Sequence, residues 1–136
     1  MMEDLIRLLH EGDHSLVVAN GDVCTFDGRG VNDLYSLFKE DPGFLKGASV
    51  ADKVVGKGAA ALMILGGVGE LHADLISEPA LALLTTARVR VLYEKKVPQI
   101  RNRARTGCCP VEKLCRDAAT AEECLPLIEE FMNSIK

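Results

Sequence analysis

The central stretch of the chain, residues 49–79, has the clearest pattern of apolar and polar positions. Its first half carries apolar residues at helical spacing behind Ser49 and Asp52, which fit the S-x-x-[DE] capping box found at helix starts. The segment GAAALMIL that follows has no charge, as in helices that are buried on most sides. The pattern therefore predicts one helix over 49–65.

Two lysines, Lys53 and Lys57, stand four residues apart in this predicted helix. Residues at that spacing leave the same helix face one turn apart, so both ammonium groups would point in one direction. Either they form the solvated rim of the helix or they provide a paired positive charge for a ligand.

A glycine turn, GGVG, ends this helix, and a short apolar strand follows over 71–76. His72 and Asp74 fall on the opposite face of that strand from its apolar residues. Ser77 suits a helix N-cap, and the proline two residues later suits a first helical turn. Glu78 thus lies where the carboxyl end of a strand meets the start of a helix, which is where α/β proteins bind ligands.

The remaining pattern predicts a single α/β domain over 1–136 with a mixed sheet. An Asn-Gly pair between two β-rich runs indicates an antiparallel hairpin. The other predicted elements are a helix over 3–11, the hairpin at Asn20-Gly21, a helix over 31–39, a short helix after Pro79, strands over 88–93 and 97–100, and a closing helix after the capping box Thr120-x-x-Glu123, which Pro126 should bend or delay.

Composition narrows the function. The net charge of −4 argues against non-specific nucleic-acid binding, and the absence of Trp argues against a base-stacking platform. No apolar run is long enough to span a membrane, and the amino-terminal segment lacks the basic start of a signal peptide. We therefore expect a cytoplasmic protein with no nucleic-acid or membrane partner.

The one basic patch, RNRAR, precedes Cys108-Cys109-Pro110. Pro110 suits the first residue of a helix, and a thiol at a helix start beside arginines can have a lowered pKa. Cys109 is therefore either a reactive thiol or a buried, inert one.

The order of elements resembles the cytidine deaminase-like fold, a three-layer α/β/α sandwich with a mixed sheet. Active members hold zinc with an [HC]-x-E motif and a P-C-x-x-C motif at two helix starts. Ser77-Glu78-Pro79 resembles the strand end before the second motif, but Ala80 and Leu83 stand at its cysteine positions, and Asp52-Lys53-Val54 replaces the first motif. Aliphatic side chains cannot bind zinc. The resemblance thus implies no zinc-dependent deaminase, no metal and no cofactor.

The segments DKVVGK, ISEPAL and NR…CP resemble more closely a small, functionally uncharacterised prokaryotic domain family that has this fold without the zinc site. The resemblance covers nearly the whole chain and implies that its matching residues line one cleft. The predicted ligand-binding residues are Asp52, Lys53, Lys57, Ser77, Glu78, Asn102 and Arg103.

These residues and the resemblance are compatible with three functions. The first is binding of a nucleotide or an ADP-ribose-like phosphorylated ligand, with Lys53 and Lys57 on phosphate and Glu78 on a sugar hydroxyl. The second is a metal-independent hydrolase or transferase, with Lys57 as nucleophile or base and Glu78 or Asp52 moving protons, or with Cys109 as the nucleophile. The third is a non-catalytic subunit or scaffold of a homo-oligomer.

Overall fold

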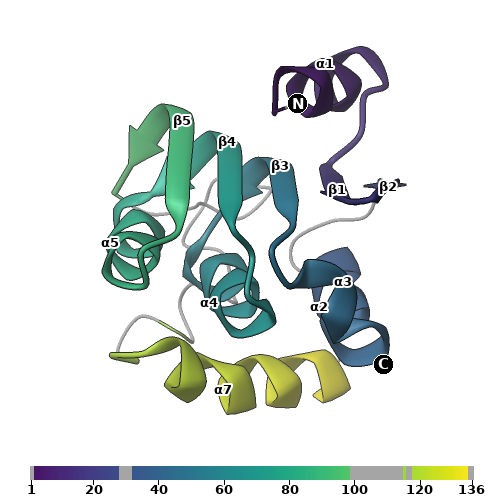
Figure 1. Cartoon of the computed structure of the whole chain (residues 1–136). Coiled ribbons are helices and arrows are strands. Elements are labelled where there is room, and N and C mark those ends of the chain that lie inside the picture. The colour runs from purple at the N-terminus through teal and green to yellow at the C-terminus, as the bar shows by residue number, and fades with distance from the viewer. Residues whose placement is uncertain (1, 28–31, 99–114, 116–117, 135–136) are drawn as a thin grey trace.

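A computed structural model describes residues 2–27, 32–98, 115 and 118–134. Its centre is a five-stranded mixed sheet with strand order β2-β1-β3-β4-β5 (Figure 1). Strand β1 is antiparallel to both of its neighbours, whereas β3, β4 and β5 are parallel to one another. The strands are β1 (Leu16–Asn20), β2 (Asp22–Phe26), β3 (Ser49–Val55), β4 (Glu70–Ser77) and β5 (Arg90–Val97).

Helices lie on both faces of this sheet. On one face, α1 packs on β1 and β3; on the other, α4 lies against the sheet with α5 beside it and α2 and α3 at its flank. The last helix, α7, lies on the far side of α4 from the sheet (Figure 1). The helices are α1 (Met2–Glu11), α2 (Asn32–Glu40), α3 (Pro42–Leu45), α4 (Lys57–Gly66), α5 (Glu78–Thr86) and α7 (Ala121–Ser134).

Side chains along β1 point alternately to the two faces of the sheet. Val17 and Ala19 pack with Leu5 and Leu9 of α1 in a small core. Val18, between them in sequence, belongs to the large core on the opposite face. The alternation follows from the period of two in a strand, and it fixes α1 and α4 on opposite sides of the sheet.

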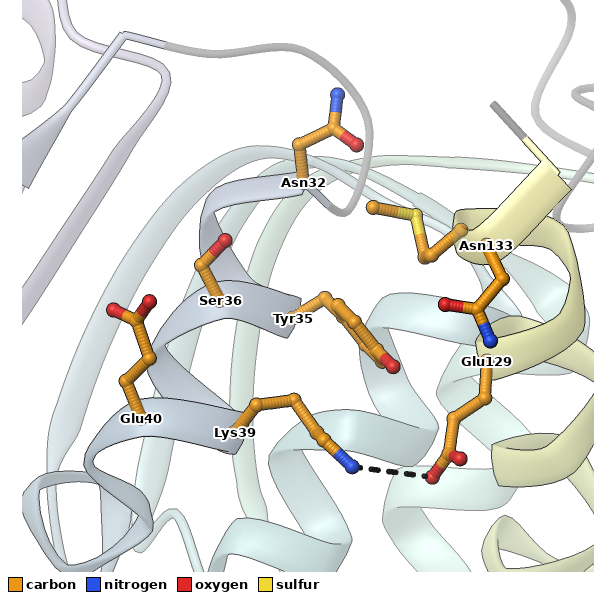
Figure 2. A pocket seen from close by; sticks show the side chains of 8 residues that line it. Asn32, Tyr35, Ser36, Lys39, Glu40, Glu129 and Asn133 are labelled. Atoms are coloured by element: carbon orange, nitrogen blue, oxygen red, sulfur yellow. Dashed lines mark ion pairs between the residues drawn. The ribbon is translucent and has the colours of Figure 1, made fainter. Parts of the chain in front are cut away.

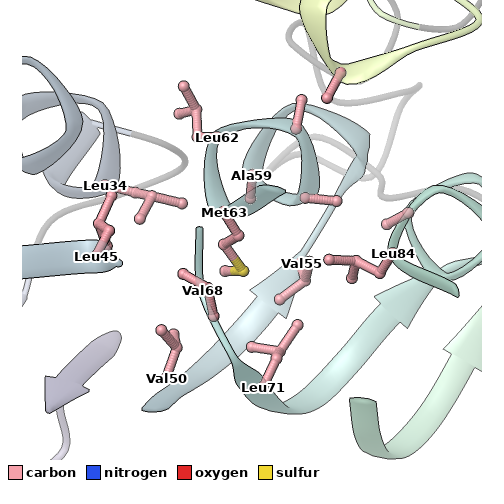
Figure 3. Packing of buried hydrophobic residues seen from close by; sticks show 14 of the residues in the cluster. Leu34, Leu45, Val50, Val55, Ala59, Leu62, Met63, Val68, Leu71 and Leu84 are labelled. Carbon is pink, nitrogen blue, oxygen red and sulfur yellow. The ribbon is translucent and has the colours of Figure 1, made fainter. Parts of the chain in front are cut away.

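The uncharged half of the predicted central helix is helix α4, and its burial is confirmed. All residues from Lys57 to Met63 are buried, because α4 lies between the sheet and α7. Figure 3 shows Leu62 and Met63 of α4 among the buried side chains of the sheet and the neighbouring helices. The helix ends as predicted at a glycine, Gly67, which adopts a positive φ of 85°.

The first half of the predicted central helix is wrong, because residues 49–55 form strand β3. The apparent capping box serves other contacts: the Ser49 hydroxyl donates to Glu70, and the Asp52 carboxylate accepts from the N–H of Val54. Strand β3 pairs with β1 and β4 on its two edges, and its β-branched valines favour an extended chain. Lys53 and Lys57 therefore do not share a helix face.

The other predicted elements are close to the observed ones. The helix over 3–11, the antiparallel hairpin and the strand over 71–76 are confirmed. The capping box of α7 is confirmed as well, with hydrogen bonds in both directions between Thr120 and Glu123. Strand β5 runs on to Val97 instead of ending at 93, and α7 begins five residues before Pro126 without the expected delay. Residues 99 and 100 lie outside the described part.

The three parallel strands share an irregularity. Residue 52 pairs with 73, and 73 pairs with 93; the pairing then resumes with 54, 75 and 95. Lys53, Asp74 and Glu94 are therefore left out of the register at the same level of all three strands. Along β4, the residues that face the large core are Leu71, Ala73 and then Ile76, so the alternation breaks at the same level. Lys53 and Asp74 lie on the α1 face by ordinary alternation from Ala51 and His72, and the break follows them.

Candidate functional site

Two helices start side by side at the carboxyl edge of the parallel strands. The last residue pair between β3 and β4 is Val55 with Ile76. The chain enters α4 at Lys57 and α5 at Glu78, directly after these strands. We call Lys57, Ser77 and Glu78 the helix-start site, because these predicted residues lie where α4 and α5 begin.

The start of α4 combines a helix amino end with a buried cation. Its N-cap is Gly56, which offers no side-chain acceptor to the N–H groups of the first turn. Lys57 is only 8% exposed, and its ammonium group donates a hydrogen bond to the backbone carbonyl of Ala118. This bond fastens the segment that leads into α7 to the amino end of α4.

The start of α5 is capped as the sequence predicted. Ser77 is fully buried, and its Oγ accepts a hydrogen bond from the N–H of Ala80 at 3.2 Å. Glu78 follows in the first turn and is exposed to solvent. The hydroxyl is thus committed to the cap, whereas the carboxylate is available to a ligand at the edge of the sheet.

Replacing the buried cap should weaken α5. We expect Ser77→Ala to lower the free energy of unfolding by about 1–2 kcal/mol, because the N–H of Ala80 loses its acceptor inside the protein. Urea denaturation measures this loss. The matched control is Thr86→Ala at the other end of α5, where an exposed hydroxyl donates to the carbonyl of Ala82; it should change stability by less than about 0.5 kcal/mol. Equal losses in both variants would contradict the cap's contribution.

Cys124 of α7 lies close to the Lys57 ammonium, and Cys115 is its hydrogen-bond partner. Cys115 and Cys124 are both fully buried, and neither forms a disulfide. A hydrogen bond from Cys115 lowers the pKa of the Cys124 thiol, and the positive charge of Lys57 lowers it further, against the opposing effect of burial. The sequence showed five cysteines but not that Cys124 lies near Lys57, since their proximity depends on the packing of α7 on α4.

The other two predicted residues on β3 lie elsewhere. Lys53 donates a hydrogen bond of 2.9 Å to Asp13, which lies just after α1. Its positive charge is therefore paired on the α1 side of the sheet. The side chain of Asp52 is half-buried in the sheet. Burial raises its pKa to about 8; backbone N–H groups oppose the rise, and the negative charge of Asp74 adds to it.

A second polar cluster, which we call the histidine–aspartate cluster, consists of His10, His72 and Asp74. The Nε2 atom of His10 lies 2.8 and 2.9 Å from the two carboxylate oxygens of Asp74, and Nε2 of His72 lies 3.0 Å from one of them. The cluster ties α1 to β4. Sequence reasoning placed His72 and Asp74 on one strand face but missed His10, because it is 64 residues away from Asp74.

Comparison with known proteins places the chain in a family. The profile described as "Domain of unknown function (DUF1893)" matches residues 4–132. The chain belongs to the DUF1893 family. A crystal structure of a DUF1893 family protein, TM1506 from Thermotoga maritima, aligns with a TM-score of 0.88 and 28% sequence identity, over 95% of this chain and 88% of that one. No curated protein matches the chain. The expected membership of an uncharacterised family is therefore confirmed.

Several predicted features of this DUF1893 domain fall outside what the structure describes. Asn102, Arg103 and Cys109 lie within residues 99–114.

Among the described residues, no group of three or more His, Cys, Asp or Glu side chains is arranged to hold a metal ion. In that same part of the chain, no helix has the length and apolar character needed to cross a membrane.

A surface pocket of this DUF1893 domain lies away from the helix-start site, between α2 and α7. Its volume is about 500 Å³, and none of the predicted site residues lines it. Figure 2 shows Lys39 of α2 facing Glu129 of α7 across the pocket, in an ion pair of 3.7 Å. Because this pair is solvent-exposed, it adds little stability.

Proposed function

We propose that this DUF1893 domain has a zinc-less cytidine deaminase-like fold and binds a nucleotide or an ADP-ribose-like phosphorylated ligand at the helix-start site. Support for the fold comes from the strand order, with an antiparallel hairpin at one edge and three parallel strands beyond it. Two helices begin at the ends of adjacent parallel strands, which is the position of the zinc site in active deaminases. Lys57 and Glu78 occupy these two starts.

The observation that carries the binding proposal is the buried Lys57 ammonium at an amino end of α4 that has no side-chain cap. The first-turn N–H groups and the helix dipole favour an anion at this point. A lysine charge held away from bulk water adds to the attraction for phosphate. These three contributions converge at the carboxyl edge of β3, where ligands of α/β proteins bind.

The proposed contacts differ from those predicted by the sequence. Lys57 and the first turn of α4 attract the phosphate, and the exposed carboxylate of Glu78 accepts a hydrogen bond from a sugar hydroxyl. Ser77 positions α5 and does not contact the ligand, because its hydroxyl caps the helix. Lys53 is not part of the site, since it is bound to Asp13.

Isothermal titration calorimetry with ADP-ribose, ADP and unphosphorylated adenosine tests the proposal. We expect the phosphorylated compounds to bind and adenosine to bind at least about tenfold more weakly. Lys57→Gln should weaken the binding of ADP-ribose by about 10–100-fold, because a charge-assisted hydrogen bond is lost. Thermal unfolding of each ligand-free variant separates this effect from loss of the fold.

The chain offers a matched control, Lys53→Gln, which removes the same charge four residues earlier. Because Lys53 forms an ion pair with Asp13, away from the helix-start site, this variant should leave the affinity for ADP-ribose unchanged. Equal weakening by both substitutions would show that net charge, and not the helix-start site, attracts the ligand. No binding of any phosphorylated compound by the unmodified protein would refute the proposed function.

A further inference from the structure

We propose that two copies of this chain pair through their β5 strands, antiparallel and about a two-fold axis at Leu92, to form one continuous sheet. Strand β5 is at one edge of the sheet, and no other strand among the described residues pairs with its outer side. A strand edge of this kind presents a row of N–H and C=O groups that can pair with another chain. The inference does not depend on the proposed ligand.

Strand β5 is long and exposed on both faces. It has eight residues, of which only Val91 and Val97 are half-buried and the other six are exposed. Leu92 is 54% exposed and Tyr93 is 43% exposed, although they are large apolar or aromatic side chains. They lie next to each other in the strand and so extend on opposite faces. Pairing at this point would cover both of them.

The charges on β5 identify a second copy as the partner. In an antiparallel pair with Leu92 opposite its symmetry equivalent, Arg90 of each copy lies opposite Glu94 of the other. The two-fold axis therefore creates two ion pairs with a Leu–Leu contact between them. Neither Arg90 nor Glu94 has an ion-pair partner among the described residues, so both charges are available.

Two neighbouring registers of the same symmetric pair, with the axis moved toward the carboxyl end of β5, are less favourable. A two-fold axis at Tyr93 would place Arg90 opposite Lys96 of the other copy, and an axis at Glu94 would place two carboxylates opposite each other. Like charges directly opposite destabilise a strand pair, whereas opposite charges contribute to it. The charge pattern along β5 thus selects the Leu92 axis over these two.

The arrangement has a geometric consequence for the proposed site. Antiparallel pairing reverses the strand direction in the second copy. The carboxyl ends of β3 and β4 in the two copies therefore point in opposite directions along the joined sheet. The two helix-start sites would then be separate, and each would be built from one chain only.

Sedimentation velocity over a range of protein concentrations tests the pairing. We expect the unmodified protein to reach a dimer. Arg90→Glu and Glu94→Arg should each raise the dissociation constant at least about tenfold, because each converts two opposite-charge pairs into two like-charge pairs. The double variant R90E/E94R restores opposite charges across the axis and should dimerise like the unmodified protein.

Mixing gives a sharper test of the register. The R90E variant carries two glutamates and the E94R variant two arginines at these positions, so an equimolar mixture should form the heterodimer while each variant alone stays monomeric. Val23→Arg, on the exposed edge strand β2, is the matched control and should leave the dimer intact. A monomeric unmodified protein, no rescue by the double variant, or loss of the dimer through Val23→Arg would overturn the proposal.

Discussion

Leu62→Ala is expected to lower the free energy of unfolding by about 3–4 kcal/mol. Leu62 is fully buried in α4, and α4 is enclosed between the sheet and α7 (Figure 3). Truncation removes apolar contacts and leaves a cavity on the side of α4 away from the strands, which the packed neighbouring helices close only in part. Denaturant unfolding followed by circular dichroism measures the loss.

The same helix provides the control for this prediction. Leu65 lies one turn further along α4 and is only half-buried, so Leu65→Ala should cost about 1–2 kcal/mol. Both substitutions put the same residue into the same helix, and the difference between them therefore reports burial alone. Equal losses would mean that α7 does not cover α4 in solution.

Asp52→Asn is expected to make the protein more stable at alkaline pH. In the folded protein burial raises the pKa of Asp52 from 3.8 to about 8. Between these two pH values the folded state holds a proton that the unfolded state has released, so stability falls as pH rises from about 4 to about 8. Asparagine has no charge to bury, and at pH 9 the variant should be more stable by on the order of 2–4 kcal/mol.

Unfolding free energies measured from pH 4 to pH 9 test this prediction. Near pH 4 the variant and the unmodified protein should agree within about 1 kcal/mol, because Asp52 is then protonated in the folded state. Asp13→Asn is the control with the opposite sign. Lys53 lowers the pKa of Asp13, so this carboxylate stabilises the protein above pH 4 and the contribution is lost as pH falls below that. A variant of Asp52 with an unchanged pH profile would contradict the burial of its charge.

The sequence was sufficient where local chemistry and burial agree. The Asn-Gly hairpin, the glycine end of α4 and the Ser77 cap each depend on a few adjacent residues with strong conformational preferences. The uncharged run of α4 also predicted its own burial. These elements are enough to place the helix start at Glu78 directly after a strand.

The prediction failed at residues 49–55 because two patterns compete there. Ser49 and Asp52 have the spacing of a capping box, but Val50, Val54 and Val55 favour an extended chain. A strand that is paired on both edges and largely enclosed lacks strict alternation, so its periodicity cannot be told from that of a helix. The β-branched residues were the available signal.

The candidate site was predictable in part for a related reason. Glu78 was predicted at a helix start directly after a strand, as observed, whereas the helix wrongly predicted over 49–65 left no strand end before Lys57. The contacts of Lys53 with Asp13 and of His10 with Asp74 depend on where α1 packs, which no local pattern specifies. The same holds for Cys124 near Lys57, since α7 reaches α4 only in the folded chain.

The position of α4 between the sheet and α7 affects how the chain folds during synthesis. A ribosome makes α4 more than 50 residues before α7 begins, so the apolar outer side of α4 has no cover while those residues emerge. The nascent chain therefore exposes an apolar surface until α7 has been synthesised. Chaperone contact is expected to be strongest in this interval and to end when α7 docks.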